Sequence, residues 1–419
     1  MPKIKHRSSG ARFIDIKARS SSVSANDKLT VVSLFSGCGG LDIGLEMAGF
    51  ETLACVETDA HCRETLRYNR PQWKLMEKDK AVADNGEIIS RVPGDIRAVD
   101  AKEVLEATGL KPGECTLVVG GAPCQPFSNI GKKLGKEDER NGDLFLEFVR
   151  FVKGINPKAF IFENVTGITQ GRHNDVIEYM LKHLSGLGYG ISYAILNAAH
   201  YGVPQKRERF FMIGIKGTDA PAFPLPTHFR PDFRFWLQFL SDNNLPETLP
   251  MPETWQSVAK TFAALPDNIR DRQDYVVMNI SPKVVERMKL VKPGQNFKVL
   301  PESMLPPCWR NGKHQGQDTF GRMLPDEPSV TIRTAAYNPS KGMYIHPFEN
   351  RGLNSMELAA LQSFPVDWVF KNKSKPKLTL VSGGRQIGNA VPPLMAAALG
   401  KAIIAQLDKK VGAAKKGKK

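Results

Sequence analysis

The sequence lacks long apolar runs, a signal-peptide core and clustered cysteines, and each absence excludes a class of protein. No stretch reaches the roughly 18–20 apolar residues of a membrane-spanning helix, so we expect no membrane contact. Six cysteines in 419 residues, with no C-x-x-C pair, do not form the framework of a disulfide-rich secreted protein. Eight scattered histidines without an H-E-x-x-H pattern predict no metal site.

Positive charge is in excess, with 58 Lys and Arg against 43 Asp and Glu, for a net charge of +15. Much of it lies at the two ends of the chain. Residues 1–28 are a basic, Ser-rich arm that we expect to be solvated and partly disordered, with a transit peptide or nuclear signal as the alternative. Residues 409–419 form a Lys-rich tail. Both tails would add salt-sensitive, non-specific affinity for nucleic acid.

Between the tails, buried-strand patterns alternate with helical patterns from Thr30 onward. This alternation predicts a parallel, doubly wound α/β sheet whose ligand lies beyond the C-terminal ends of the strands. The expected strands are 30–35, 51–56, 115–120, 159–162, 191–196 and 210–215, and the expected helices are 41–49, 60–68, 143–152, 175–187, 356–362 and 394–407.

The sequence pattern changes after residue 215. Residues 216–330 are Pro-rich and irregular, and regular patterns return near Met356. We therefore expect a catalytic and cofactor-binding domain at 29–215, a smaller second domain at 216–330, and a return segment at 331–408 that completes the first domain.

A Gly-rich turn, residues 36–40, follows the first expected strand, and Glu57 ends the second strand. Glu57 stands at the offset of about 20 residues from Gly37 at which a carboxylate can hold ribose hydroxyls. Asp42 replaces the third glycine of a dinucleotide-binding turn, and a carboxylate at a helix N-terminus would oppose a pyrophosphate. The turn therefore predicts a site for a nucleoside ligand without phosphates, such as S-adenosylmethionine. A plain tight turn that binds no ligand is the alternative.

A cysteine lies in a stiffened loop after the expected strand 115–120. Pro123 and Pro126 flank Cys124-Gln125 and restrict the backbone that would present the thiol. A lone cysteine is more often an inert buried residue, but this loop context favours a nucleophile. The stretch 129–142 is rich in Lys, Arg and Gly, and we expect either a flap that contacts phosphates or an ordinary solvated loop.

Six segments resemble the motifs of the cytosine-C5 DNA methyltransferase family and stand in that family's usual order. They are Phe35–Gly40, the Pro-Cys-Gln loop within 121–131, Phe162–Val165, Gln205–Arg209, residues 351–365, and Gln386–Pro392. They span most of residues 30–400. The resemblance implies a doubly wound, Rossmann-like sheet of the S-adenosylmethionine-dependent methyltransferase type. It also implies that 216–330 is a target-recognition domain.

Carbon 5 of cytosine is a poor nucleophile, and attack of a thiolate on carbon 6 makes it reactive toward a methyl group. Cys124 is the cysteine in a plausible place for this attack. Glu163 follows a buried strand, so its acid would emerge at the same sheet edge and hydrogen-bond ring nitrogen 3, with burial helping to keep it protonated. The resemblance implies that Arg209 contacts the cytosine carbonyl oxygen and that Arg207 holds a phosphate. No residue is identified as the base that removes the carbon 5 proton, and water stays open.

The resemblance also implies a set of residues for S-adenosylmethionine. Glu57 would bind the ribose, Thr58 would lie beside the adenine where the family often has an aromatic residue, and Asp95 would hold the adenine. A packing role is the alternative for each member of the set. The full set is Phe35, Ser36, Gly37, Cys38, Gly39, Glu57, Thr58, Asp95, Ile96, Pro123, Leu144, Asn389 and Ala390.

A duplex hides carbon 6, so the target base must be flipped out of the stack. The flap would close over it through Gln125, Ser128, Lys132 and Arg140. The segment from Gln315 to Arg322 resembles the family's recognition loops. Arg322 would read a guanine edge, Gln315 or Gln317 would fill the gap left by the base, and Thr331 would contact the DNA backbone. A plain surface loop is the alternative.

We interpret the chain as a sequence-specific DNA (cytosine-5-)-methyltransferase, the modification half of a bacterial restriction–modification pair. We expect a monomer that acts on double-stranded DNA in the cytoplasm, at the nucleoid, with a restriction endonuclease as its functional partner. A eukaryotic source would place it in the nucleus. The alternatives are a transfer RNA cytosine-C5 methyltransferase, a non-catalytic DNA-binding regulator, and a dinucleotide-dependent oxidoreductase. The recognition sequence is not encoded in any readable motif.

Overall fold

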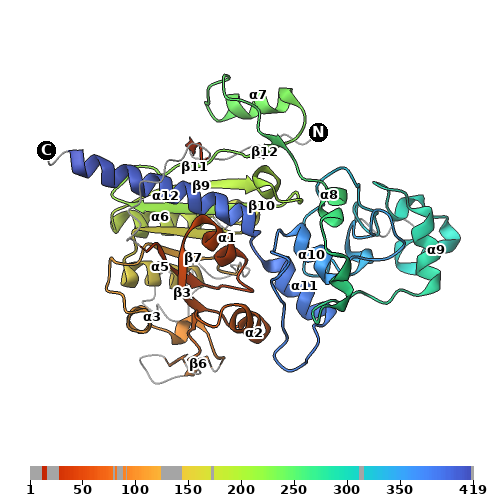
Figure 1. Cartoon of the computed structure of the whole chain (residues 1–419), viewed down its shortest axis with the longest axis horizontal. Coiled ribbons are helices and arrows are strands. Elements are labelled where there is room, and N and C mark those ends of the chain that lie inside the picture. The colour runs from red at the N-terminus through yellow and green to blue at the C-terminus, as the bar shows by residue number, and fades with distance from the viewer. Residues whose placement is uncertain are drawn as a thin grey trace.

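A computed structural model describes residues 12–16, 28–78, 81–82, 88–90, 92–123, 144–170, 174–310 and 316–416. Its centre is a seven-stranded sheet with the order β4-β3-β2-β7-β8-β10-β9 (Figure 1). The strands in that order are Lys74–Leu75, Glu51–Val56, Thr30–Leu34, Leu117–Gly120, Ala159–Asn164, Glu208–Lys216 and Tyr189–Asn197. The six predicted strands are therefore all present.

The sheet is mostly parallel, as predicted, but one strand runs the other way. β2 pairs in parallel with β3 and β7, and β7 pairs in parallel with β8. β10 is antiparallel to both β8 and β9. Only residues 198–207 join β9 to β10, which is too short for the crossover that a parallel pair needs, so β10 reverses direction.

Alternate residues of the central strands face two separate cores. Val32 and Leu34 of β2 lie in a core formed with α3 (Ala101–Thr108), α5 (Leu144–Ile155) and α6 (Asn174–Gly186). Val31 faces the opposite core, which contains residues of α1 (Gly40–Ala48) and α12 (Pro393–Lys416). Both faces of the sheet are therefore covered, and the sites for ligands are left at the strand ends.

Helices α1 and α12 pack very closely, although residues far apart in the sequence form them. A Cβ atom on Gly44 would lie 2.1 Å from the Pro393 carbonyl oxygen and 2.5 Å from the Ala396 Cβ. A Cβ on Gly40 would lie 2.4 Å from the Val391 carbonyl oxygen. This contact brings residues of the return segment next to the Gly-rich turn.

One stretch of the described chain, Leu380–Lys409, is long and apolar enough to cross a membrane, although no such run was expected. It consists of α11 (Leu380–Asn389) and α12 up to Lys409, separated at 390–392. In the apolar window, 72% of the residues are buried inside the protein. The apolar residues of this stretch therefore pack in the protein core, those of α12 against α1.

The segment after β10 is more regular than the sequence indicated. It contains α7 (Phe233–Asp242), α8 (Val258–Ala263) and α9 (Pro282–Leu290), which are short and separated by Pro-rich stretches, so no long apolar period marks them. Figure 1 shows α8, α9, α10 (Ser355–Leu361) and α11 on one side of the molecule and the central sheet on the other. α7 has its own aromatic cluster around Trp236 and Phe229.

The remaining elements are short. The helix α2 (Ala60–Asn69) follows β3, and its residues join a core with α10 and the segment 332–390. Strand β1, in the N-terminal arm, pairs with β11 and so attaches residues 13–14 to the body of the protein. The minor strands are β1 (Phe13–Ile14), β5 (Ala81–Val82), β6 (Ile88–Ser90), β11 (Phe223–Pro224), β12 (His228–Phe229) and β13 (Glu253–Thr254).

Candidate active site

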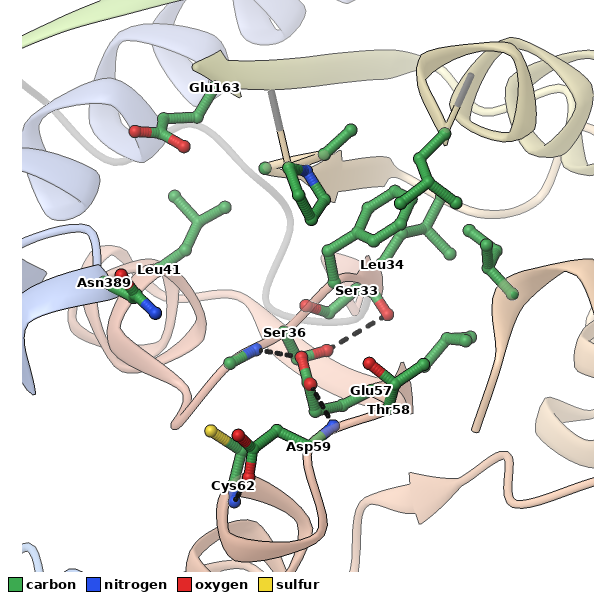
Figure 2. Close-up of a pocket in the computed structure, with 18 of the residues that line it drawn as sticks. Ser33, Leu34, Ser36, Leu41, Glu57, Thr58, Asp59, Cys62, Glu163 and Asn389 are labelled. Atoms are coloured by element: carbon green, nitrogen blue, oxygen red, sulfur yellow. Dashed lines mark hydrogen bonds between the residues drawn. The ribbon is translucent and has the colours of Figure 1, made fainter. Parts of the chain in front are cut away.

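A cavity of about 710 Å³ lies at the C-terminal ends of β2, β3, β7 and β8 (Figure 2). This is the position that the alternating pattern predicted. Helix α11 and the residues after it close one side. The predicted site residues that line it are Phe35, Ser36, Gly37, Glu57, Thr58, Asp95, Ile96, Pro123, Leu144, Glu163, Arg209, Asn389 and Ala390.

The Gly-rich turn is held by Glu57. The Gly37 amide donates a hydrogen bond of 2.7 Å to Glu57 Oε2, and the Asp59 amide donates one of 2.6 Å to Oε1, as drawn in Figure 2. Phe35, Gly37 and Gly39 take positive φ angles of 55°, 55° and 87°. A left-handed Phe35 is strained, and such strain clusters at functional sites. Burial raises the pKa of the Glu57 carboxyl, although these amides lower it.

Three residues of the turn region do not face the cavity. Cys38 is buried and its thiol lies 3.2 Å from the Gln386 carbonyl oxygen, and Gly39 packs against Leu66 and Trp368. Neither lines the cavity, which corrects their predicted contact with the cofactor. Asp42 is fully buried away from it, so the expected repulsion of a pyrophosphate does not follow from its position.

Asp95 lines the cavity, but its carboxylate is already engaged. Arg97 donates to Asp95 Oδ1 from Nε at 3.0 Å and to Oδ2 from Nη2 at 2.5 Å. Burial raises the pKa of this carboxyl, but the hydrogen bonds from Arg97 and Ser90 outweigh it and hold the pKa below its ordinary value. Asp95 is thus an ionised acceptor at the cavity wall, and its contact with adenine stays a prediction.

Glu163, at the end of β8, forms an ion pair with Arg209, at the start of β10. Their Oε1 and Nε atoms lie 3.1 Å apart, and the two side chains are 12% and 15% exposed. Burial raises the pKa of the Glu163 carboxyl above its ordinary value, although Arg209 and Arg207 lower it. The strands β8 and β10 pair directly, with Glu163 opposite Phe211. This register places the acid and the guanidinium side by side.

The predicted nucleophile Cys124 lies outside the described residues. The described residues before it, Gly121 to Pro123, line the cavity. A Cβ on Gly121 would lie 2.6 Å from Glu163 Oε2, so the chain approaches the acid closely just before the cysteine. Asn164 donates a hydrogen bond of 3.1 Å to the Ala122 carbonyl and fixes this approach.

The other cysteines are poorly suited to nucleophilic attack. Cys38, Cys55, Cys62 and Cys115 are buried, and burial raises the pKa of each thiol, to about 11 for Cys115. A thiol with a raised pKa holds little thiolate at neutral pH. Cys308 is exposed and does not line the cavity. The burial of these four cysteines agrees with the prediction, made from its loop, that Cys124 is the nucleophile.

Arg207 does not have the predicted phosphate-binding role. Its side chain is buried and donates to the carbonyl oxygens of Ile332, Gly388 and Ala390 at 2.8 to 3.0 Å. Its 1% exposure leaves no access for a phosphate. Arg207 instead ties β10 to the return segment that forms the cavity wall. Sequence cannot distinguish an arginine that caps buried carbonyls from one that faces solvent.

Arg322 also needs correction. All parts of its guanidinium are used: Nε donates to Val291, Nη1 to His346 and Glu349, and Nη2 to Met288 and to Asn350 Oδ1, at 2.6 to 2.7 Å. The residue is 5% exposed. Five bonds from five N–H groups leave no donor for a guanine edge.

The other predicted DNA-binding residues divide into two groups. Gln317 is held by Lys298, whose Nζ lies 2.7 Å from Gln317 Oε1, and the exposed Thr331 hydroxyl donates to the Lys206 carbonyl at 2.9 Å. Both keep their predicted roles as predictions. Those that lie outside the described residues are Gln125, Ser128, Lys132, Arg140 and Gln315.

Three charged residues of the cavity, Asp59, Arg97 and Arg385, were missed. Asp59 follows Glu57 and Thr58, and it caps α2 by accepting from the His61 and Cys62 amides. Arg385 precedes the motif at 386–392, and Asp59 and Arg385 both line the cavity. Their position next to matched residues could have pointed to Asp59 and Arg385. Nothing in the sequence indicates that these two side chains meet. Within the described ranges no group of His, Cys, Asp and Glu could hold a metal.

Comparison with known proteins fits this geometry. Residues 29–405 match the family model of C-5 cytosine-specific DNA methylases. Type II methyltransferase M.Eco47II of Escherichia coli is 32% identical over 389 residues, which cover 92% of this chain and 81% of the relative. Type II methyltransferase M.Sau96I of Staphylococcus aureus is 33% identical over 405 residues, covering 94% and 79%.

Solved structures share the fold at lower identity. A mutant of Spodoptera frugiperda DNMT2 has a TM-score of 0.56 at 14% identity, covering 90% of this chain and 99% of its own. The Dnmt2 methyltransferase of S. pombe has a TM-score of 0.52 at 16% identity, covering 91% and 99%. The fold is the Rossmann-like fold of S-adenosylmethionine-dependent methyltransferases. With the family model matched over residues 29–405, this chain belongs to the C-5 cytosine-specific DNA methylases.

Proposed function

We propose that this S-adenosylmethionine-dependent DNA cytosine-5-methyltransferase modifies one short DNA sequence and so protects host DNA from a restriction endonuclease. The proposal rests on the Glu163–Arg209 pair in the wall of the cavity, beside the loop that leads to Cys124. The names of the Type II relatives favour the restriction–modification setting. We propose that the protein acts as a monomer in the cytoplasm.

The first chemical step falls to Cys124. Its thiolate adds to carbon 6 of the flipped cytosine, and the electron pair of the 5,6 double bond moves toward nitrogen 3. A neutral Glu163 donates a hydrogen bond, and then its proton, to that nitrogen. The raised pKa of Glu163 favours the neutral form that this step needs. Arg209, beside it, donates to the carbonyl oxygen at carbon 2.

The residues of the cavity fit the proposed cofactor. Glu57 supplies a carboxylate for ribose hydroxyls, and Ile96, Pro123 and Leu144 supply an apolar wall for a flat ring. When bound there, S-adenosylmethionine supplies the methyl group that carbon 5 accepts. A base then removes the carbon 5 proton and the bond from Cys124 to carbon 6 breaks, which returns the thiolate. Nitrogen 3 gives its proton back to Glu163, so neutral 5-methylcytosine and the neutral acid are restored.

We propose that residues 216–330, which include α8 and α9, read the bases that flank the target. Gln317 and Thr331 are the described residues that we assign to DNA contacts; Gln317 lies in this segment and Thr331 directly follows it. With Arg322 committed to backbone carbonyls and to Asn350, base reading must depend on other side chains.

Bisulfite sequencing of plasmid DNA from cells that express the protein tests this function. Protected cytosines at one recurring sequence are the expected result, and they should vanish when Cys124→Ser is expressed at the same level. Unmethylated plasmid, or the same protection with Cys124→Ser, would contradict the proposal. Resistance of the plasmid to an endonuclease that cuts the same sequence would test the restriction–modification role separately.

A further inference from the structure

Residues 329–332 lie alongside residues 204–207, the stretch that leads into β10. The Thr331 hydroxyl donates a hydrogen bond of 2.9 Å to the Lys206 carbonyl. Arg209, in the cavity wall, follows Lys206 by three residues. A displacement of Thr331 would therefore act on the stretch that presents Arg209 to the cavity.

A second hydrogen bond reaches Thr331 from a buried tyrosine. The Tyr344 hydroxyl donates to the Thr331 carbonyl at 2.7 Å. The residue is 0% exposed, and its ring packs so closely on Gly342 that a Cβ there would lie 2.5 Å from Tyr344 Cε2. Burial raises the pKa of Tyr344 to about 12, so the hydroxyl keeps its proton at neutral pH. Tyr344 is thus a fixed donor to the backbone of Thr331.

Tyr344 is also attached to the segment 315–322, which we call the recognition loop. It lies in the stretch 342–345, which pairs with Gly321 near the end of that loop. The Gly321 carbonyl accepts from the Ile345 amide at 3.0 Å, and the Gly321 amide donates to the first residue of the stretch at 3.2 Å. Because these hydrogen bonds join two backbones, a shift of the recognition loop carries Tyr344 with it. Hydrogen bonds therefore lead from the recognition loop through Tyr344 to Thr331.

On the proposed function, Thr331 contacts the DNA backbone near the target, and the recognition loop meets the flanking bases. We propose that Tyr344 is a positioning residue that holds Thr331 in register with the recognition loop, and so helps to determine which sequence is methylated. When the flanking bases fit the loop, Tyr344 places Thr331 and the target strand correctly at the cavity. A wrong flanking base shifts the loop, and the same hydrogen bond then carries Thr331 out of place. Tyr344 thus acts on sequence choice from a buried position.

Tyr344→Phe tests this role, because it keeps the ring and removes only the hydroxyl. Single-turnover methyl transfer by the full chain is measured on two duplexes. One carries the sequence found by bisulfite sequencing, and the other has a single flanking base pair changed. We expect the variant to methylate the target duplex about 10- to 100-fold more slowly, since a small misplacement of reacting groups costs this much. The altered duplex should lose less, because Thr331 is already misplaced on it, so the ratio of the two rates should fall about threefold or more.

Tyr189→Phe is the matched control. Tyr189 is also buried, and its hydroxyl donates to the Pro157 carbonyl at 2.5 Å. It pairs with Lys216 at one end of β10, whereas Arg209 lies near the other end. Each variant removes one donor from a backbone carbonyl, so both should lower the melting temperature to a similar, small extent. Only Tyr344→Phe should change the ratio of the two rates.

Thr331→Val provides a second variant that does not depend on the stability of a buried ring. It breaks the next hydrogen bond along the same path, from Thr331 to Lys206, and should lower the ratio of rates as well. Combined with Tyr344→Phe, it should lower the ratio little further than either substitution alone, because both act on one path. Fully additive effects would place the two residues on separate paths and contradict the proposal.

An unchanged ratio of rates in Tyr344→Phe, whether both rates fall equally or neither changes, would overturn the positioning role. The proposed function would still stand in that case, provided that the unsubstituted protein methylates the target duplex. Failure of the unsubstituted protein to methylate any DNA would instead refute the proposed function, and the role of Tyr344 with it.

Discussion

Glu163 Oε1 and Arg209 Nε lie 3.1 Å apart in the wall of the cavity, on two strands that pair side by side. Burial and this pairing act on the acid in opposite directions: burial raises the pKa of Glu163, and the guanidinium lowers it. The net pKa is raised, which favours a neutral acid able to donate a proton.

Glu163→Gln should slow methyl transfer about 10²- to 10⁴-fold, the contribution of a positioned general acid. Gln keeps the shape and can donate a hydrogen bond, but it cannot release a proton to nitrogen 3. Single-turnover transfer of a labelled methyl group to DNA measures the effect. Because Arg209 loses its counter-charge, thermal unfolding of the variant must be followed in parallel. A folded variant with undiminished rate would contradict the assigned role.

Asp42→Asn should stabilise the protein more at pH 8 than at pH 5. Asp42 is fully buried, and burial raises its pKa from 3.8 to about 7. The folded state binds this proton more tightly than the unfolded state. The protein therefore loses stability as pH rises from 3.8 to about 7. The gain from Asn should therefore grow with pH and reach the order of a few kcal/mol. Urea unfolding at several pH values measures it, and a difference independent of pH would refute the prediction.

Arg322→Gln should destabilise the fold by about 2–5 kcal/mol, because it leaves buried carbonyl oxygens without donors. Chemical unfolding measures this loss. Arg333→Gln is a suitable control, since the side chain of Arg333 is 57% exposed and pairs with Asp318. If Arg322→Gln kept full stability and changed the DNA sequence that is methylated, Arg322 would be a base reader after all.

Gly44→Ala should be destabilising, although Ala is normally about 1 kcal/mol better than Gly inside a helix. The added Cβ would lie 2.1 Å from the Pro393 carbonyl oxygen, so α12 must move away from α1. We expect a lower melting temperature and weaker binding of S-adenosylhomocysteine, because α12 follows the cavity residues 389–391. An unchanged or higher melting temperature would mean that the two helices can separate at no cost.

Sequence reasoning succeeded where one residue and its neighbours determine the outcome. The buried strands, the turn at Gly37 and the place of Glu57 at the end of the next strand follow from local patterns and a fixed spacing. The hydrogen bond from the Gly37 amide to Glu57 was not predicted. Most residues predicted for the cofactor also line the cavity, because motifs at strand ends meet at one sheet edge, and their binding roles stay predictions.

Hydrogen bonds between residues far apart in the sequence limited what could be predicted for the site. Arg207 and Arg322 carry the same guanidinium as Arg385. The first two donate to buried carbonyl oxygens, whereas Arg385 lines the cavity. Those carbonyls belong to residues up to 183 positions away in the sequence. Likewise, the burial of Asp42 depends on the packing around α1, which no local pattern reports.

Covalent trapping tests the central claim most directly. A DNA duplex in which 5-fluorocytosine replaces the target cytosine cannot lose a proton from carbon 5, so the enzyme should remain attached after methyl transfer. With S-adenosylmethionine present, we predict an adduct that survives denaturation and maps to the peptide that contains Cys124, and no adduct with Cys124→Ser. Absence of an adduct with the unsubstituted protein, or an adduct that persists with Cys124→Ser, would contradict the account.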